Sequence, residues 1–372
     1  MSSALEVSAD GAEPFASLAR LRADGPVHRV RTPDGPPAWL VVRYADVRAL
    51  LGDPRLSLHR GSSHGRDYTG FDLPPQLDAH LLNSDPPRHT RLRRQIAPSF
   101  TAQRVRELEP LVQQIAGELA AGLPAEVDLV ADFAVELPVR VVGELLPLPQ
   151  EAREAFAAWA DALLRAPGEE PRARDTMRRM QEVIGAALAS RPPARSLLAG
   201  LLSARGSGRM DADELTSMVF YLLFVWYEIM VHAVGSALHR LPESTSDTGV
   251  EEVLRHHPPQ LLAAPRYPLQ ELDLGGVRIP AGDTVLLSTA SANHDERVFA
   301  RPAEFDPHRA PNPHLSLGHG PHACPAAALT RVLTRTAARA VHSRHPTATT
   351  PPTWRGNFRH HGPATLPARL AR

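Results

Sequence analysis

The stretch LGHGPHACPAAAL, which runs from Leu317 to Leu329, contains the only cysteine in a chain of 372 residues. A single cysteine cannot form a disulfide within its own chain, so Cys324 needs an explanation other than an internal crosslink. The lack of disulfides also favours a reducing compartment. A chain of this length can bury a sizeable core, as one large domain or as two.

The charge balance excludes two classes of partner. Lysine is absent, and 41 arginines balance 41 acidic residues, which leaves no basic footprint for nucleic acid or for an anionic membrane.

The amino terminus, MSSALEVSADGAEPF, lacks the basic and apolar regions of a secretory signal. The most apolar run, Met218 to Tyr227, is about half of the roughly 20 residues that a membrane span needs, and Glu228 interrupts it. We therefore expect a cytoplasmic protein.

Helical periodicity dominates the middle of the chain. From Thr101 to about His239, apolar residues recur at steps of three and four. The later segment LDLGGVRIPAGDTVLLSTA reads instead as short strands separated by turns. We expect a single domain over residues 1–372, with a β-rich part at about 1–60, a helical core at about 80–260, and a β-patch with the cysteine loop at about 260–335.

The residues around Cys324 predict a tight loop followed by a helix. Gly318 and Gly320 allow sharp backbone turns, and Pro325 is favoured at the first position of a helix. A cysteine just before a helix amino terminus is stabilised as a thiolate by the backbone N–H groups and the helix dipole. On these residues alone the thiolate could be a nucleophile, a redox sensor or an iron ligand, and a buried inert thiol is a further alternative.

The wider array resembles the cysteine loop of the cytochrome P450 family. The residues that carry the resemblance are Leu317, Gly318, Gly320, His322, Cys324, Ala328, Leu329 and Arg331. The resemblance implies that Cys324 is the axial thiolate of a heme b iron, that His322 contacts a heme propionate, and that Leu317 and Gly318 lie against the cofactor. Leu317 replaces the usual aromatic residue and Ala326 replaces a glycine, changes that we expect to retune the sulfur environment without abolishing heme binding.

Other motifs of the family occur in the expected order. Glu252 and Arg255, three apart on one helix face, resemble its Glu-x-x-Arg motif, with Arg309 completing a structural triad. Two further segments resemble its propionate contacts: His89 and Arg93, four apart on one helix face, and Arg266. The resemblance covers nearly the whole chain. It implies a mainly α fold with small β-sheets, a triangular prism that holds heme between the central I helix and the helix after the cysteine loop.

The central helix departs from the family pattern. Members of the family usually have a pair of small residues followed by an acid and an alcohol, which together admit oxygen and relay protons. Aligning Glu228 with the acid places Val225 and Trp226 at the small pair and Ile229 at the alcohol. The enzyme could therefore use ordered water or a substrate hydroxyl with Glu228, or perform chemistry that needs less proton delivery. Alternatively, Trp226 and Tyr227 are core residues that face away from the heme.

The family also implies a function and partners. Its soluble bacterial members commonly tailor secondary metabolites such as antibiotics, so we expect a monooxygenase-type oxidoreductase acting on a hydrophobic intermediate. Electrons would come from a ferredoxin and its reductase, with Arg331 and Arg335 facing the ferredoxin. Residues between Leu58 and Leu82, and the helices from Phe156 to Leu188, would line the entrance.

A catalytically degenerate homologue is the alternative. The segment HRLPESTSDTGV is too short for the additional helix that the family normally has there. Its shortness is compatible with a surface for a partner biosynthetic enzyme, which such a homologue would assist as an auxiliary or activator protein.

The 18 histidines raise the separate question of a histidine metal site. The adjacent pairs His256-His257 and His360-His361 point apart on a helix or strand, and neither has an acidic or thiol partner at ligand spacing. We therefore expect no metal site besides the iron on Cys324.

Overall fold

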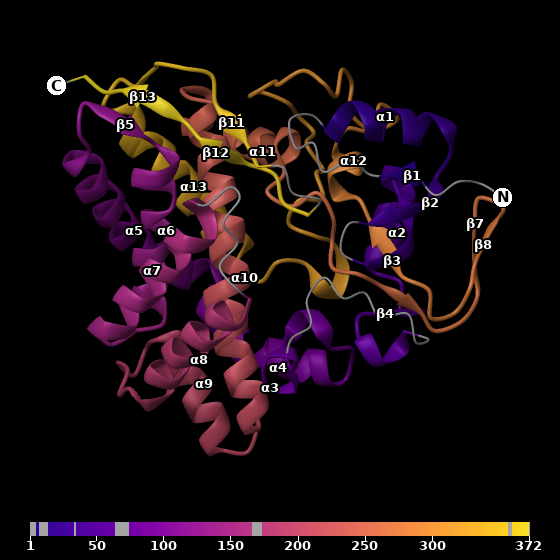
Figure 1. Ribbon diagram of the computed structural model, residues 1–372, viewed down its shortest axis with the longest axis horizontal. Helices are drawn as coiled ribbons and strands as arrows, with labels where there is room; N and C mark the ends of the chain where they lie inside the picture. The colour runs from indigo at the N-terminus through magenta and orange to yellow at the C-terminus, as the bar shows by residue number, and fades with distance from the viewer. Residues whose placement is uncertain are drawn as a thin grey trace.

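The computed structural model describes residues 5–6, 14–32, 35–63, 74–165, 173–355 and 359–371 (Figure 1). Its α-helices are α1 (Pro14–Asp24), α2 (Tyr44–Leu51), α3 (Pro75–Asp78), α4 (Arg88–Ile96), α5 (Ala102–Gly122), α6 (Glu136–Leu145), α7 (Gln150–Arg165), α8 (Ala173–Ala189), α9 (Leu197–Gly206), α10 (Ala212–His239), α11 (Asp247–His256), α12 (Thr289–Asn293) and α13 (Ala327–His342). Its strands are β1 (Leu5–Glu6), β2 (Val27–Thr32), β3 (Gly35–Val41), β4 (Leu56–Ser57), β5 (Glu126–Asp128), β6 (Tyr267–Pro268), β7 (Leu272–Leu274), β8 (Val277–Ile279), β9 (Val285–Leu287), β10 (Thr347–Ala348), β11 (Thr353–Trp354), β12 (Pro363–Thr365) and β13 (Pro367–Arg369). Short 3-10 or π turns are η1 (Arg60–Ser62), η3 (Leu81–Asn83), η4 (Ala97–Phe100), η5 (Val130–Ala134), η6 (Glu243–Thr245) and η7 (Gly320–His322).

The main sheet joins the beginning of the chain to its last third. Its strand order is β1-β2-β3-β9, and β3 and β9 run parallel with Trp39 opposite Val285. The pairing is reinforced at its edge because the Trp39 indole N–H donates to Asp283 at 2.9 Å. All three residues of β9 are buried, as expected for a strand covered on both faces. Helices α2 and α12 pack together beside this sheet.

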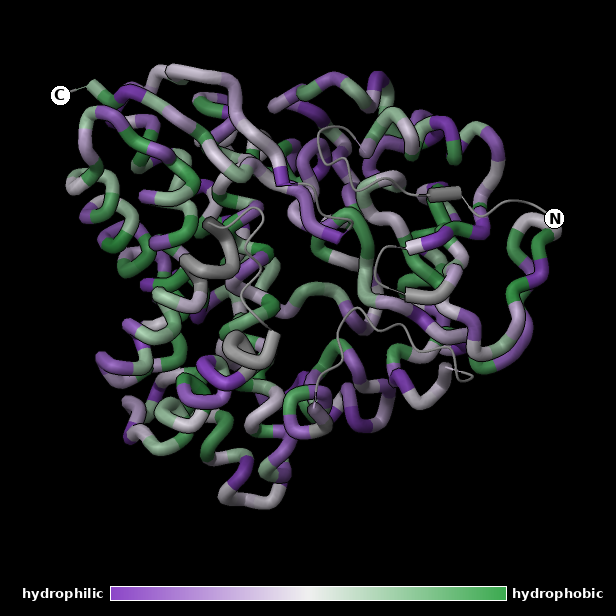
Figure 2. The backbone as a smooth tube through the Cα atoms, in the orientation of Figure 1, coloured by the Kyte–Doolittle hydropathy of each residue, from purple (hydrophilic) through white to green (hydrophobic). Residues whose placement is uncertain are grey.

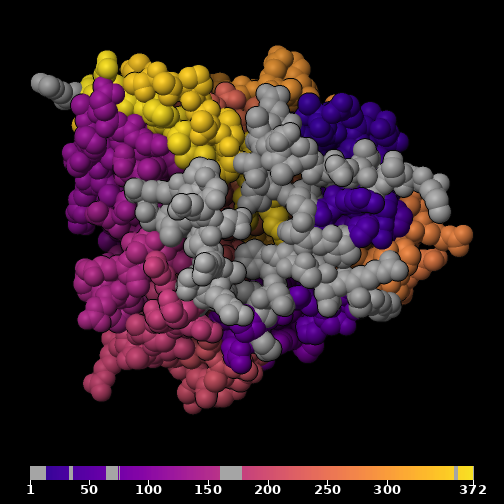
Figure 3. Space-filling view, in the orientation of Figure 1, coloured from indigo at the N-terminus to yellow at the C-terminus, as the bar shows by residue number. Residues whose placement is uncertain are grey.

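Helices α5 to α10 and α13 gather on the other side of the molecule (Figure 1). Figure 3 shows the magenta and pink segments, which include α5 to α9, on one side and the indigo and orange segments on the other. In Figure 2 green and purple alternate along these helices, as they do in amphipathic helices that bury one face. The largest apolar cluster lies here and includes Leu92, Phe133, Phe156 and Leu333.

Helix α10 is the long element of this core. A capping box starts it, because Asp211 accepts a hydrogen bond from the Glu214 N–H at 2.8 Å and Glu214 accepts one from the Asp211 N–H at 3.1 Å. The helix then continues through Glu228, and it packs against α13, α3 and α6.

The continuation of α10 corrects one sequence expectation. Over its 28 residues, α10 is long and apolar enough to cross a membrane, so the run is not too short for a span. The protein itself buries 72% of the most apolar window, which identifies α10 as a core helix.

The connection from α10 to α11 is as short as the sequence predicts. It contains only the single turn η6 before Ser246 caps α11 by accepting a hydrogen bond from the Gly249 N–H at 3.0 Å. The helix after Cys324, by contrast, starts at Ala327, so Pro325 precedes the helix and is not its first residue.

Candidate active site

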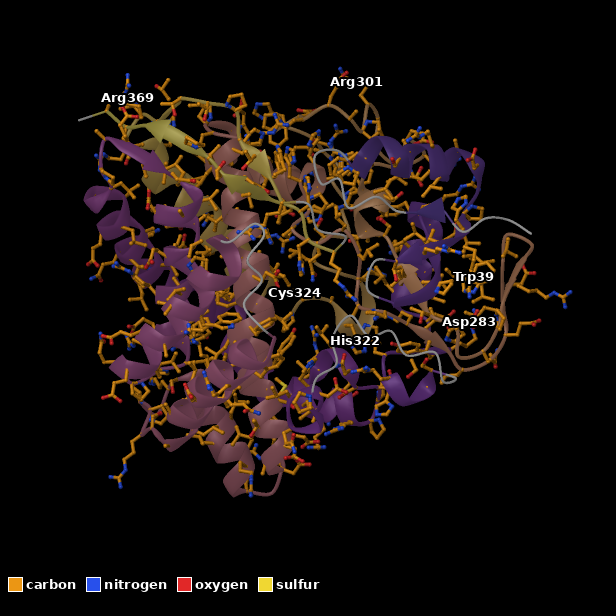
Figure 4. The ribbon with its side chains drawn as sticks, in the orientation of Figure 1. Trp39, Asp283, Arg301, His322, Cys324 and Arg369 are labelled. Carbon is orange, nitrogen blue, oxygen red and sulfur yellow. The ribbon has the colours of Figure 1, made fainter. Side chains whose placement is uncertain are left out.

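A cavity of about 250 Å³ separates α10 from the cysteine loop. Cys324 and His322 lie near the middle of the molecule, between the helical side and the sheet side (Figure 4). From α10 the lining includes Phe220, Tyr221, Phe224, Val225, Trp226, Glu228, Ile229 and Met230. From the cysteine loop it includes Leu317, Gly318, His322 and Cys324. The expected thiol ligand and the expected oxygen-activating segment therefore line the same cavity.

Two glycines shape the cysteine loop. Gly318 and Gly320 have φ values of 74° and 72°, in the left-handed region that favours glycine. A Cβ on Gly320 would lie 3.0 Å from the Cα of Gly52, so the loop also needs glycine for its close approach to α2. The loop closes where the Cys324 N–H donates to the carbonyl oxygen of Leu317 at 2.8 Å.

Burial is the largest influence on the acidity of the Cys324 thiol. Burial raises the pKa of Cys324, and this effect outweighs the backbone N–H of Ala326 and the charges of Arg93 and Arg331, which lower it. The start of the following helix therefore favours the thiolate of Cys324 as expected, but desolvation opposes it more strongly. Coordination to a metal ion deprotonates a thiol outright, so an iron ligand is compatible with this environment.

The residues expected to hold propionates lie together. The rings of His89 and His322 are 3.9 Å apart, and Nε2 of His89 is buried without a hydrogen-bond partner. Arg266 is only 3% exposed and donates to the carbonyl oxygen of Ala264 at 3.0 Å. Burial, His89 and Arg266 lower the pKa of His322 to about 3, and burial followed by the charge of Arg93 lowers the pKa of His89. The two arginines supply positive charge and the two histidines supply N–H donors, a set that fits a group carrying carboxylates.

On the α10 side, Trp226 and Tyr227 point in different directions. Trp226 lines the cavity together with Glu228 and Ile229, whereas Tyr227 packs in the core with its ring 5.4 Å from that of Phe156. The alternative that both aromatics face away from the cavity is therefore wrong for Trp226 and right for Tyr227.

Glu228 has a partner from the end of the chain. Oε1 of Glu228 lies 3.0 Å from Nδ1 of His360, and His232 is one helical turn further along α10. Burial would raise the pKa of Glu228, but His360, His232 and Arg355 together lower it to about 2, so the carboxylate is ionised at neutral pH.

This cluster also overturns the expectation that the histidine pair at 360–361 has no acidic partner. The spacing of Glu228 and His232, four apart on one helix, was the signal in the sequence that could have indicated a two-residue site. The third member, His360, is 132 residues from Glu228, and no pattern in the sequence indicated it.

The three residues of the expected triad meet away from the cavity. Arg255 donates to Glu252 at 2.7 and 2.8 Å, and the Arg309 Nε–H donates to the same carboxylate at 3.1 and 3.2 Å. The side chains of Glu252 and Arg255 are fully buried. Arg255 also donates to backbone carbonyl oxygens of Asn293, Pro302 and Glu304, so it joins α11 to the segments that precede the cysteine loop.

The expected entrance is only partly found. Leu58, Arg60, His80 and Leu82 line the cavity, and residues 64–73 of that range lie outside the described residues. No described side chain between Phe156 and Leu188 lines it.

Arg331 and Arg335 are not unpaired cations. Arg331 donates to Glu251 at 2.5 and 3.0 Å, and Arg335 donates to Glu109 at 2.8 Å and also pairs with Asp247. These acids neutralise the two arginines within the chain.

Comparisons with known proteins agree with this geometry. The family model "Cytochrome P450" matches residues 247–332. The cytochrome P450 monooxygenase PikC of Streptomyces venezuelae is 37% identical over 360 residues, which cover 90% of this chain and 84% of that protein. The mycinamicin IV hydroxylase/epoxidase of Micromonospora griseorubida is 38% identical over 340 residues, covering 84% and 83% of the two chains.

The solved structure of the tirandamycin C-bound P450 monooxygenase TamI is also similar. It superposes with a TM-score of 0.87 at 33% identity, over 98% of this chain and 100% of that one. The predicted mainly α fold with small sheets is thereby confirmed. The chain belongs to the cytochrome P450 family, whose members are monooxygenases that carry heme b.

Proposed function

We propose that this P450 oxidises a hydrophobic secondary-metabolite intermediate and that its proton delivery differs from the usual acid and alcohol pair. The observation that carries the proposal is the shared cavity, with Cys324 on one side and Trp226, Glu228 and Ile229 on the other. Bound heme would supply a thiolate-ligated iron that activates oxygen. The relatives, which include antibiotic-tailoring monooxygenases, support the class of substrate.

The chain's own residues would hold the cofactor from three directions. Cys324 would ligate the iron, while His89, Arg93, His322 and Arg266 would bind the propionates by charge-assisted hydrogen bonds. Leu317 and Gly318 would pack beside the sulfur and keep water from it. The partnerless Nε2 of His89 supports this assignment, because a buried polar atom normally has a partner.

Glu228 is the only residue of the three named on the α10 side of the cavity, Trp226, Glu228 and Ile229, that can carry a proton. Ile229 has no hydroxyl group, so it cannot pass a proton from Glu228 into the cavity or hold a water by donating to it. We infer that a water molecule or a hydroxyl group of the substrate takes this part. Trp226 narrows the cavity and excludes bulk water, which keeps the proton path short.

The proposal also covers partners and location. Ferredoxin and its reductase would supply electrons in the cytoplasm, as they generally do for soluble bacterial members of the family. Arg331 and Arg335 are already paired with acids, so the docking surface would depend on other residues or on rearrangement of these pairs.

The auxiliary-protein alternative rests on the bulky distal residues and the short α10–α11 connection. This alternative predicts a chain without functional heme. The absorption spectrum therefore decides between a heme enzyme and an auxiliary protein.

The deciding experiment is the absorption spectrum of the purified protein, oxidised and then reduced under carbon monoxide, after expression with ample heme. A strongly red-shifted Soret band is expected in the wild type and absent in Cys324→Ala, because no other thiol exists in the chain. The loop variant His319→Ala, whose side chain does not line the cavity, is the matched control and keeps the band. A heme-free wild type, or an unchanged spectrum in Cys324→Ala, would contradict the proposal.

A further inference from the structure

Glu228, His232 and His360 form a compact cluster beside the cavity. One potential ligand atom from each of the three side chains lies within 4.8 Å of the others. Glu228 and His232 are one turn apart on α10, and His360 comes from the segment between β11 and β12, which packs over α10. Two separate elements therefore bring one carboxylate and two imidazoles to the same point.

One buried ring nitrogen in this cluster lacks a hydrogen-bond partner. His232 is 2% exposed, and its Nδ1 has none. Nδ1 of His360 faces the Glu228 carboxylate at 3.0 Å, so it already has a charged partner. Buried polar atoms are normally satisfied, so the unsatisfied Nδ1 of His232, in a cluster with Glu228 and His360, indicates a missing ligand.

The packing around His232 leaves room for its ring only because residue 362 is glycine. A Cβ on Gly362 would lie 2.5 Å from Nδ1 of His232. The rings of His232 and His360 are close to parallel, with an interplanar angle of 20° and centroids 5.7 Å apart. Small side-chain rotations would bring the three ligand atoms to the spacing of about 3.4 Å that bonds of about 2.1 Å require.

We propose that Glu228, His232 and His360 bind a divalent transition-metal ion of the Zn²⁺ class, separate from the heme iron. Two imidazoles and a carboxylate are a common ligand set for zinc and leave one position open. Glu228 and His360 line the cavity, so the open position would face it. An occupied site would take the Glu228 carboxylate out of the proton path and so act as an inhibitory site.

One nearby charge opposes the metal ion. Arg355 acts electrostatically on both Glu228 and His232 and is itself buried enough for desolvation to lower its pKa. Its positive charge repels a cation, so removing this charge should increase the affinity of the site for zinc. Arg355→Gln is expected to bind zinc more tightly by roughly tenfold.

The experiment is equilibrium dialysis of the heme-loaded protein against micromolar Zn²⁺, with zinc and heme measured on the same samples. The wild type is expected to retain one more zinc per chain than Glu228→Gln, His232→Gln or His360→Gln. Each of these variants is expected to lose about tenfold or more in affinity, since even outer-shell changes cost that much. His361→Gln, which changes the neighbouring histidine on the same segment, is the matched control and retains the zinc.

Two further variants guard against misfolding. Gly362→Ala keeps all three ligands but crowds the His232 ring, so weaker binding at unchanged heme content supports the site. Tighter zinc binding in Arg355→Gln supports the site as well, because misfolding of the variant would not increase its affinity for zinc. Equal zinc content in the wild type and in all three ligand variants would overturn the proposal and leave Glu228 and His360 as an ion pair only. The heme spectrum is read separately, so this result leaves the proposed function untouched.

Discussion

Glu228 and Ile229 are neighbours on α10 that both line the cavity, yet only one of them can move a proton. Glu228 is ionised at neutral pH, because His360, His232 and Arg355 outweigh the cost of its burial. Because its pKa is so low, its carboxylate binds a proton only transiently, so it can relay a proton into the cavity but not store one. Ile229 contributes only apolar surface. This enzyme therefore cannot relay protons through the acid and alcohol pair that is usual in the family.

Replacing Glu228 with glutamine should slow oxygen-dependent turnover without affecting heme binding. The amide preserves the shape of the side chain but carries no exchangeable acid proton, so we expect at least about a tenfold loss in turnover rate. The measurement is product formed per electron consumed, together with the carbon monoxide spectrum. An unchanged rate and an unchanged ratio of product to electrons would remove Glu228 from the proton path.

Glu252 is a residue whose carboxylate neutralises a fully buried cation. In Glu252→Gln, Arg255 would remain charged at 0% exposure without an anionic partner, and Arg309 would lose the same partner. We expect the free energy of unfolding to fall by about 3 to 5 kcal/mol, measured by urea denaturation. The control is Glu107→Gln in the exposed pair with Arg104, where a change below about 1 kcal/mol is expected. Equal effects in both variants would show that the buried carboxylate is not needed.

Among the secondary-structure elements, η6 and α11 pack closely against each other. Gly249 lies in the first turn of α11, and a Cβ there would be 1.8 Å from the carbonyl oxygen of Glu243. This contact is possible only because the connection from α10 is so short that η6 and α11 pack directly on each other. The shortened connection is therefore a packed junction that depends on a glycine.

Gly249→Ala should destabilise the protein, because the clash is with a backbone atom that no side-chain rotation can relieve. A loss of about 1 to 3 kcal/mol in the free energy of unfolding is expected. Gly117→Ala in α5 is the matched control, since a Cβ there meets nothing within 4 Å. Alanine at that helical site should stabilise by about 0.5 to 1 kcal/mol. A neutral Gly249→Ala would mean that the junction relaxes freely.

Across the whole molecule, buried histidines join the sheet side to the helices. The rings of His256, on α11, and His294, after α12, are 5.3 Å apart. Burial is the main reason that the pKa of His256 falls to about 4 and that of His294 to about 3, and the charge of Arg255 lowers both. Both rings are therefore neutral in the folded protein at every pH above about 5.

The protein should accordingly lose stability in mildly acidic solution. Below pH 6.5 the unfolded chain binds protons at these histidines and the folded chain does not, so acid favours unfolding. As the pH falls from 6.5 to about 4, each histidine should lower the free energy of unfolding by about 1.4 kcal/mol per pH unit. Glu214 and Glu251, whose pKa values are lowered to about 2, contribute their loss only below pH 4.5.

Urea unfolding at pH 7.5, 6.5 and 5.5 measures this slope. The double variant His256→Gln and His294→Gln should show a shallower decline than the wild type, whereas a double variant of the exposed His342 and His345 should not. A wild-type stability that stays constant down to pH 5.5 would contradict the prediction.

Local patterns were sufficient for much of this protein. The glycines around Cys324 predicted the loop before α13, and three- and four-residue spacing predicted the helices. These features depend on residues close in sequence, whose geometry the helical repeat or a turn sets directly. The spacing of Glu252 and Arg255 likewise placed both side chains on one helix face.

The remaining features depend on contacts and burial that no local pattern encodes. The rotation of α10, which turns Trp226 into the cavity and Tyr227 into the core, is set by packing against neighbouring helices. His360 reaches Glu228 from 132 residues away, and the chain between them determines that meeting. Burial also opposes the thiolate of Cys324 more strongly than the helix start favours it, because desolvation depends on how much of the surrounding protein excludes water. Sequence alone therefore determined which chemical groups are present and in which elements, and tertiary packing determined which of them meet and how they are charged.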